Sequence, residues 1–181
     1  MAVQERRYTV AEFEQFIELP ENADRLFEYI GGKIVEVVSN TYASAVAARV
    51  NYWISHYVIQ HESGHVTGAD GGYVVAGERY IPDVAFVAKA RQPQLDRPYC
   101  PIPPDLAVEV LSPSNNPRAM RLKIANYLVA GTVVWVVDPD RKMVEVYTPG
   151  QAARTVGIDG TLDGGEVLPG FTVAVKEIFP V

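Results

Sequence analysis

The stretch DLAVEVLSPSNNPRAMRLKIANYLVAGTVVWVVD (residues 105–138) carries the pattern that decides the fold. Residues 105–111 are apolar enough for a buried strand, and residues 132–138 are nearly all apolar, as expected for a strand in the middle of a covered sheet. Between them, Asn116 can cap a helix that has Pro117 at its first position. A strand, helix, strand unit of this kind predicts two parallel strands joined by a right-handed crossover.

Hairpins and a second long helix surround this unit. Residues 26–30 and 33–38 are predicted to be strands joined by a tight Gly-Gly turn. A long helix follows, with apolar residues at helical spacing over 46–58, and it should end at Ser63-Gly64. Together these elements predict one α/β (α+β) domain over residues 1–181, with a mixed central β-sheet flanked by helices.

Shorter patterns predict the remaining elements. Thr9-Val10-Ala11-Glu12 fits a capping box that opens a short helix, which Pro20 ends. The other expected elements are strands over 73–75, 81–88 and 143–147, a loop over 91–104, and short strands with a final turn over 151–181.

The composition of the chain indicates in which compartment the protein works and which classes of partner it can bind. The chain has 181 residues, of which 48% are hydrophobic, and this is enough for one core but too little for two ordinary domains. It has no apolar run of membrane-spanning length and no apolar signal core at its start, and its single cysteine, Cys100, excludes an intrachain disulfide. We therefore expect a cytoplasmic protein. The net charge of −6 argues against a general nucleic-acid binder but not against a nuclease, because an acidic metal pocket adds negative charge.

Two acids stand inside apolar strands. Asp83 lies in IPDVAFV (residues 81–87) and Glu109 in LAVEVL (residues 106–111). A buried carboxylate without a partner is costly, so such groups are normally paired, hydrogen-bonded or bound to metal. If the two strands are neighbours, both acids could converge on one divalent cation, and Mg²⁺ prefers oxygen ligands. The alternative is that each acid sits at a strand end or accepts a backbone hydrogen bond.

Two further charged residues are candidates for the same site. Lys123 lies one turn before Tyr127 at the border of the apolar helix stripe, where it could stabilise developing phosphate charge or instead extend to solvent. Glu28 lies within another apolar strand. It could be a further ligand of the metal or of a water, or it could occupy an exposed position of an alternating strand. Arg118 and Arg121 could contact a phosphate backbone, or they could simply extend into solvent from the exposed face of the helix.

These motifs, in this order, resemble a known family. The residues that carry the resemblance are LFEYIGGKIVE (26–36), PDVAFV (82–87), PDLAVEVLSPS (104–114), Lys123, Tyr127, Gly131, WVVDP (135–139) and LPGF (168–171). Over nearly its whole length the chain is similar to the Uma-type domain of unknown function, a restriction-endonuclease-like group of the PD-(D/E)XK nuclease superfamily. The resemblance implies a restriction-endonuclease-like core.

The resemblance also implies a Mg²⁺-dependent phosphodiesterase site, in which Mn²⁺ could substitute. Asp83 and Glu109 would be the metal ligands, Glu28 an accessory acid and Lys123 the lysine of the site. The implied substrate is nucleic acid, with DNA as the expected form, and the implied assembly is a homodimer. No membrane contact is expected, because the sequence has no apolar run of membrane-spanning length. The superfamily signature places a lysine two residues after the second-strand acid, where this chain has Leu111, and Lys123 is the natural substitute.

Two other functions stay open on the sequence. A nuclease-like scaffold without catalysis could act as a binding or dimerisation module, which the acidic pI near 5.1 and Leu111 favour. His61-Glu62-Ser63-Gly64-His65 matches the H-E-x-x-H signature of zinc peptidases. That mechanism needs both histidines on one helical face, and the helix is expected to end between them.

Overall fold

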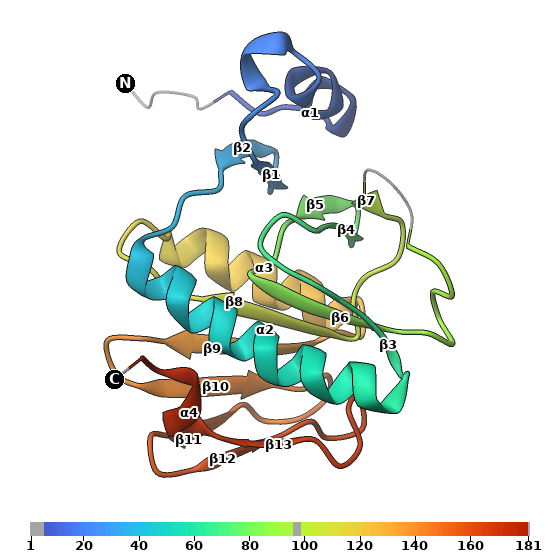
Figure 1. The fold of residues 1–181 in the computed structure, drawn as a ribbon. Helices are drawn as coiled ribbons and strands as arrows, with labels where there is room; N and C mark the ends of the chain where they lie inside the picture. The colour runs from blue at the N-terminus through green and yellow to red at the C-terminus, as the bar shows by residue number, and fades with distance from the viewer. Residues whose placement is uncertain (1–5, 96–98, 181) are drawn as a thin grey trace.

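Two long helices on opposite faces of a six-stranded sheet organise the fold, which the computed structural model describes for residues 6–95 and 99–180 (Figure 1). The helices are α2 (Thr41–His61) and α3 (Pro117–Val129). The strands, in sheet order, are β11 (Arg154–Gly157), β10 (Met143–Tyr147), β9 (Val133–Asp138), β8 (Leu106–Val110), β6 (Val84–Ala88) and β3 (Gly64–Thr67). Because β8 and β9 run parallel and the other neighbours antiparallel, the predicted mixed sheet and its strand, helix, strand unit are confirmed.

The central strands are apolar because helices cover both of their faces. Val108 and Trp135 point to the side of α2, where they join a core with Ile54. Ala107 and Val134 point to the opposite side and join a core with residues of α3. Since side chains alternate along a strand, Glu109 faces the same side as Ala107, towards α3.

A second sheet packs on the α3 side of the central sheet. Its strands, in order, are β2 (Lys33–Glu36), β1 (Phe27–Ile30), β5 (Glu78–Tyr80), β4 (Gly72–Val75) and β7 (Tyr99–Cys100). Ile30, Tyr73 and Tyr80 share one buried core with Ala107. The second sheet therefore brings β1 close to β8, from which it is distant in sequence.

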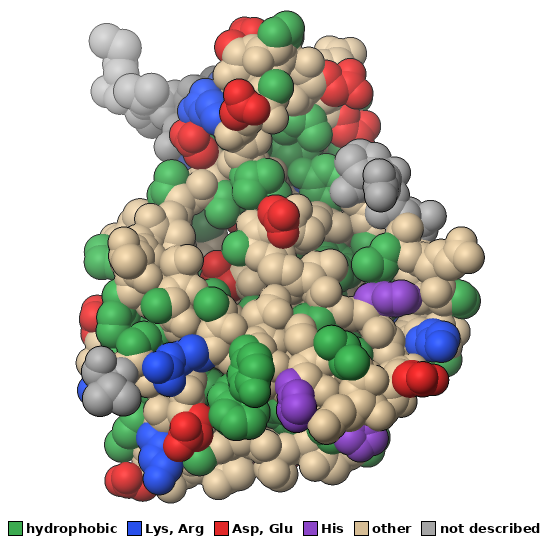
Figure 2. Space-filling view, in the orientation of Figure 1, with side chains coloured by type: hydrophobic (Ala, Val, Ile, Leu, Met, Phe, Trp, Pro, Cys, Tyr) green, Lys and Arg blue, Asp and Glu red, His purple; other side chains and the backbone are tan. Residues whose placement is uncertain are grey.

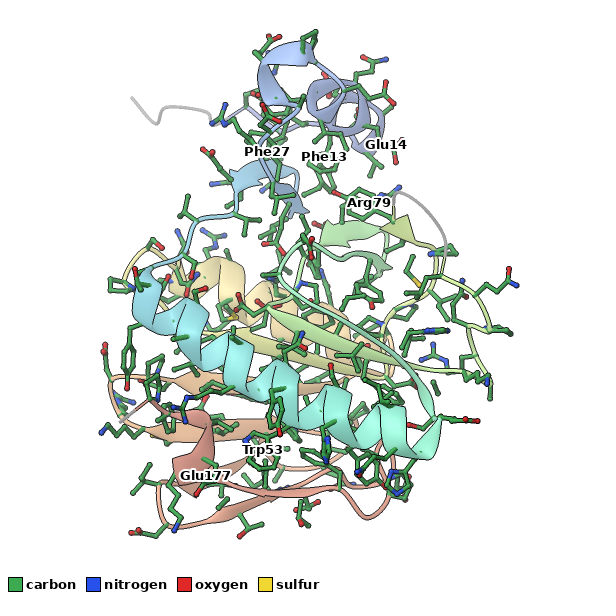
Figure 3. All side chains as sticks on the ribbon, viewed as in Figure 1. Phe13, Glu14, Phe27, Trp53, Arg79 and Glu177 are labelled. Carbon is green, nitrogen blue, oxygen red and sulfur yellow. The ribbon has the colours of Figure 1, made fainter. Side chains whose placement is uncertain are left out.

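The N-terminal segment covers the outer part of this second sheet. It forms α1 (Val10–Ile17) and the short 3-10 helix η1 (Pro20–Asn22). Phe13 packs against Phe27 in a separate small core, and Arg79 joins the segment to β5 through an ion pair with Glu14 at 2.6 Å (Figure 3). The predicted capping box is confirmed, because Thr9 and Glu12 each bond the other's backbone N–H.

The C-terminal segment closes the α2 side. It consists of the hairpin β12 (Thr161–Asp163) and β13 (Thr172–Ala174), followed by the short helix α4 (Val175–Ile178). Its apolar residues share the core of α2, against which Trp53 packs from the helix (Figure 3). Arg49 of α2 donates to the backbone oxygen of Glu177 at 3.2 Å.

Several predicted boundaries were wrong, and each error has a local cause. The left-handed residue after α2 is Glu62 (φ 48°), whereas Gly64 starts β3, a strand the sequence did not predict. A Cβ at Gly64 would lie 2.2 Å from the backbone oxygen of Val87. A glycine is therefore needed here for the close pairing of β3 with β6, and it does not cap α2. The strand predicted over 81–88 begins only at Val84. The short strands β5 and β7 were also missed, and residues 96–98 of the predicted loop lie outside the described residues.

None of the helices within the described residues combines the length and the apolar character that crossing a membrane requires.

Candidate active site

A buried ion-pair cluster forms where β1, β8 and α3 meet. Lys123 Nζ donates to Glu28 Oε1 and to Glu109 Oε2, each at 2.8 Å. The side chains of all three residues are at most 9% exposed. The alternatives of a solvent-directed Lys123 and an exposed Glu28 are therefore wrong.

Regular secondary structure holds each member of the cluster. Glu109 faces α3 because of its position on β8, and Lys123 lies on the inner face of α3, one turn before Tyr127. Glu28 sits on β1, all of whose residues are buried, and its Oε1 also accepts the backbone N–H of Ile81 at 2.7 Å. This last bond connects β1 to the segment that leads into β6.

Asp83 lies beside the cluster but outside its ion pairs. It directly precedes β6, which pairs antiparallel with β8 through Val84 and Val108. Asp83 Oδ2 accepts the backbone N–H of Val110 at 2.7 Å, and Oδ1 makes no hydrogen bond to the described residues. The condition that the two strands be neighbours is met, and Asp83 also shows the strand-end position and backbone bond of the alternative.

Three polar residues that the sequence reasoning did not assign complete the surroundings. The Tyr127 hydroxyl donates to Glu109 Oε1 at 3.0 Å, the Tyr80 ring centroid lies 5.4 Å from Lys123 Nζ, and Asn126 donates to the Tyr80 hydroxyl at 2.7 Å. The four-residue spacing of Lys123 and Tyr127 was a usable signal, since it places both on one helix face. Tyr80 had no such sequence signal, because only the packing of the second sheet brings it next to Lys123.

Burial and charge set the protonation of the cluster. Burial raises the pKa of Glu109 to about 7; Lys123 opposes the rise, and Glu28 and Asp83 add to it. Burial also raises the pKa of Asp83, against the hydrogen bond from Val110. For Lys123, burial lowers the pKa, but the charges of Glu109 and Glu28 outweigh burial and raise it above its usual value. Lys123 is therefore a permanent cation that two carboxylates share.

The charges of the cluster do not balance. With every group ionised, the carboxylates of Glu28, Asp83 and Glu109 contribute −3 and Lys123 contributes +1, which leaves −2. Among the described residues, no group of three or more His, Cys, Asp or Glu side chains is arranged to hold a metal. Asp83, directly before β6, and Glu109, on the neighbouring β8, would offer two carboxylates to a cation, and Mg²⁺ commonly binds one or two carboxylates and retains several waters.

Comparison with known proteins identifies the family. A model of the Uma2 family, described as "Putative restriction endonuclease", matches residues 13–176. The chain belongs to the Uma2 family. A crystal structure described as "a putative nuclease belonging to DUF820" from Anabaena variabilis shares the fold, with a TM-score of 0.78 and 24% identity over 92% of this chain and 96% of that one. No curated protein matched the chain.

In this Uma2 chain Lys123 of α3 contacts Glu109 of β8. Leu111, which stands at the position of the superfamily lysine, packs against the apolar core on the α3 side. Lys123 reaches the Glu109 carboxylate from α3 instead, at 2.8 Å. That Lys123 substitutes for the lysine absent at Leu111 stays a prediction.

The H-E-x-x-H match of the Uma2 chain lacks the geometry of a zinc peptidase. His61 is the last residue of α2, and His65 lies on β3. His61 Nδ1 lies 2.8 Å from the Tyr57 oxygen and His65 Nε2 lies 3.2 Å from the Pro93 oxygen. The histidines gather over the end of α2 and β3, away from the acidic side chains of the N-terminal layer (Figure 2). The two signature histidines therefore do not share a helical face.

Replacing Tyr127 with phenylalanine should destabilise the Uma2 fold by about 1–3 kcal/mol, because Glu109 Oε1 loses its donor in a buried site. Chemical denaturation would measure the loss. Tyr147→Phe is the matched control, since the Tyr147 hydroxyl also donates to a carboxylate, that of Glu145 at 2.7 Å, but on a partly exposed strand. Equal losses in the two variants would contradict a special role for the buried bond.

Proposed function

We propose that this protein is a metal-dependent nuclease that hydrolyses phosphodiester bonds of nucleic acid, with DNA as its substrate. The observation that carries the proposal is the buried cluster, in which a helix lysine meets two acids beside a third, Asp83, so that the carboxylates outnumber the lysine. The Uma2 match supports nuclease-like function in general.

In this proposal Asp83 and Glu109 hold one Mg²⁺, for which Mn²⁺ can substitute. When bound, the cation supplies polarisation of the phosphate and a lower pKa for a bound water. The hydrogen bond from the Val110 N–H fixes the orientation of the Asp83 carboxylate. Tyr127 and Lys123 fix the orientation of the Glu109 carboxylate.

Lys123 acts in this proposal as a fixed positive charge. Its raised pKa keeps it protonated at neutral pH, so it cannot serve as the general base. A protonated lysine instead stabilises negative charge that develops on the phosphate. Glu28 holds Lys123 in place by accepting its 2.8 Å hydrogen bond and acts as the accessory acid of the site.

The second candidate is an inactive nuclease-like scaffold that serves as a binding or dimerisation module. One observation favours it, namely that Lys123 and Tyr127 already engage both carboxylate oxygens of Glu109. The candidates differ in their response to salt, because a nucleic-acid enzyme loses substrate affinity as salt rises and a protein-binding module need not. We include homodimer formation in the proposal, and sedimentation of the purified protein tests it.

Cleavage of plasmid and single-stranded DNA tests the proposal. The protein should cleave with Mg²⁺ or Mn²⁺ but not with EDTA, and the double variant Asp83→Ala plus Glu109→Ala should be inactive. Asp163→Ala removes an exposed carboxylate that pairs with Arg154 at 2.7 Å and accepts the backbone N–H of Gly165; it is the control and should retain activity. Absence of cleavage with either metal, or undiminished cleavage by the double variant, would favour the scaffold.

A further inference from the structure

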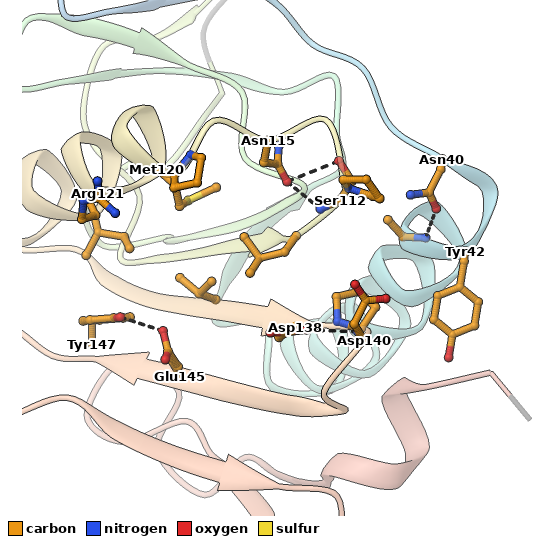
Figure 4. A pocket seen from close by; sticks show the side chains of 17 residues that line it. Asn40, Tyr42, Ser112, Asn115, Met120, Arg121, Asp138, Asp140, Glu145 and Tyr147 are labelled. Carbon is orange, nitrogen blue, oxygen red and sulfur yellow. Dashed lines mark hydrogen bonds between the residues drawn. The ribbon is translucent and has the colours of Figure 1, made fainter.

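A cavity of about 590 Å³ opens at the carboxyl ends of β8 and β9. The start of α2, the loop after β8, the first turns of α3 and the turn between β9 and β10 contribute its walls (Figure 4). Its volume lies within the usual range of small-molecule sites, which is roughly 300–1,000 Å³. No step of the proposed hydrolysis uses this cavity.

The four charged residues of the proposed site do not line the cavity, but two of its lining residues lie next to them along the chain. Leu111, one of its lining residues, follows Glu109 by two positions on the same strand face, about 7 Å further along. Ile124 also lines the cavity and directly follows Lys123 on α3. A strand of nucleic acid with one phosphate at the cluster therefore has a neighbouring nucleotide within reach of the cavity.

The inner wall of the cavity is apolar. Leu111, Ile124 and Val136 form it, and Met120 of α3 adds a flexible side chain. Tyr42, which is 41% exposed at the start of α2, offers an aromatic ring on another side. Aromatic rings and apolar side chains are the surfaces on which nucleobases stack.

The charged groups of the cavity disfavour a phosphate as its occupant. Asp138, Asp140 and Glu145 contribute −3 and Arg121 contributes +1, which leaves −2. The oxygens of Asp138 and Glu145 already accept hydrogen bonds from the β9–β10 turn and from Tyr147, respectively. Asp140 and Arg121 have side chains without a hydrogen bond to the described residues. The cavity thus suits an uncharged planar group with polar edges.

We propose that the cavity receives one unstacked nucleobase of the strand whose phosphodiester bond lies at the cluster of Asp83, Glu109 and Lys123. This inference rests on the proposed nuclease function and specifies its substrate. The apolar wall takes the face of the base, and the Asp140 carboxylate accepts from an exocyclic amino group. Because a base inside a duplex is stacked and paired, the substrate is single-stranded or has a base turned out of the helix.

Binding of a labelled single-stranded DNA tests this proposal, with each base in turn replaced by an abasic site. Fluorescence anisotropy with Ca²⁺ in place of Mg²⁺ keeps a divalent cation at the acidic cluster and reads affinity separately from cleavage. For the unmodified protein, we expect one position at which loss of the base weakens binding at least about five-fold, since stacking on side chains contributes about 1–3 kcal/mol per base. Filling the cavity with Met120→Trp should abolish this dependence.

The control is Ala125→Trp, which adds the same side chain on the exposed face of α3 and should retain the dependence on the base. Tyr42→Ala, at an exposed position, is a second variant that does not disturb the core and should weaken the dependence. Abasic strands that all bind like the intact strand, or Met120→Trp with unchanged base dependence, would overturn the proposal.

The test separates this proposal from the nuclease function. Cleavage that does not depend on any base would overturn the base site alone. Base-dependent binding without cleavage would support the base site and overturn the nuclease function. Absence of DNA binding would overturn both.

Discussion

Replacement of Lys123 by alanine is expected to lower the free energy of unfolding by about 3–5 kcal/mol, because it leaves the buried carboxylates of Glu28 and Glu109 without their shared cation. Urea denaturation near neutral pH in EDTA measures this loss. Lys176→Ala is the matched control, since Lys176 is exposed on α4, and it should change stability by less than about 0.5 kcal/mol.

A triple variant shows whether the loss comes from uncompensated charge or from lost packing. Glu28→Gln, Lys123→Met and Glu109→Gln together remove every charge of the ion-pair cluster while nearly preserving volume. Buried ion pairs replaced by neutral groups of similar volume often lose no stability, so the triple variant should be more stable than Lys123→Ala alone. A triple variant as unstable as Lys123→Ala would contradict the electrostatic explanation.

Glu109→Gln is expected to affect stability and activity in opposite directions. The folded-state pKa of about 7 lies above the usual value of 4.5, so the folded protein binds the proton of Glu109 more tightly than the unfolded chain does. Stability therefore falls as pH rises from about 4.5 to about 7, and the deficit persists above that range. Glutamine avoids this cost and should raise stability at pH 8 by roughly 1–3 kcal/mol.

Metal-dependent cleavage by Glu109→Gln should fall about a thousand-fold, because the amide replaces an anionic ligand of the proposed cation. Denaturation at a series of pH values and single-turnover cleavage would measure the two effects. Below pH 4.5 the stability difference from the unmodified protein should vanish. A variant that is less stable than the unmodified protein at pH 8, or one that retains activity, would contradict this account of Glu109.

The sequence predicted the parts of the fold in which local pattern and tertiary environment agree. The covered strands β8 and β9 and the cap of α3 are examples, because their apolar runs and the Asn116-Pro117 start are local signals. The strands β5 and β7 escaped prediction because runs of two or three residues carry no measurable periodicity. β3 escaped because its glycine was interpreted as part of a helix end.

The candidate site was predictable as a set of residues but not as a set of contacts. An acid inside an apolar strand is an anomaly that the sequence alone reveals, and this identified Asp83 and Glu109. The bond between Lys123 and Glu28 spans 95 residues, and only the packing of the second sheet on the central sheet creates it. The neighbouring cavity combines side chains from several distant segments, and none of them has a sequence signal of its own.

We expect the excess negative charge of Glu28, Asp83 and Glu109 over Lys123 to hold a divalent cation. Calorimetric titration with Mn²⁺ above pH 7 tests it most directly, because Glu109 is then ionised. One Mn²⁺ should bind per chain, and the isosteric variant Asp83→Asn should lose that binding. Absence of binding to the unmodified protein, or equal binding to Asp83→Asn, would contradict it.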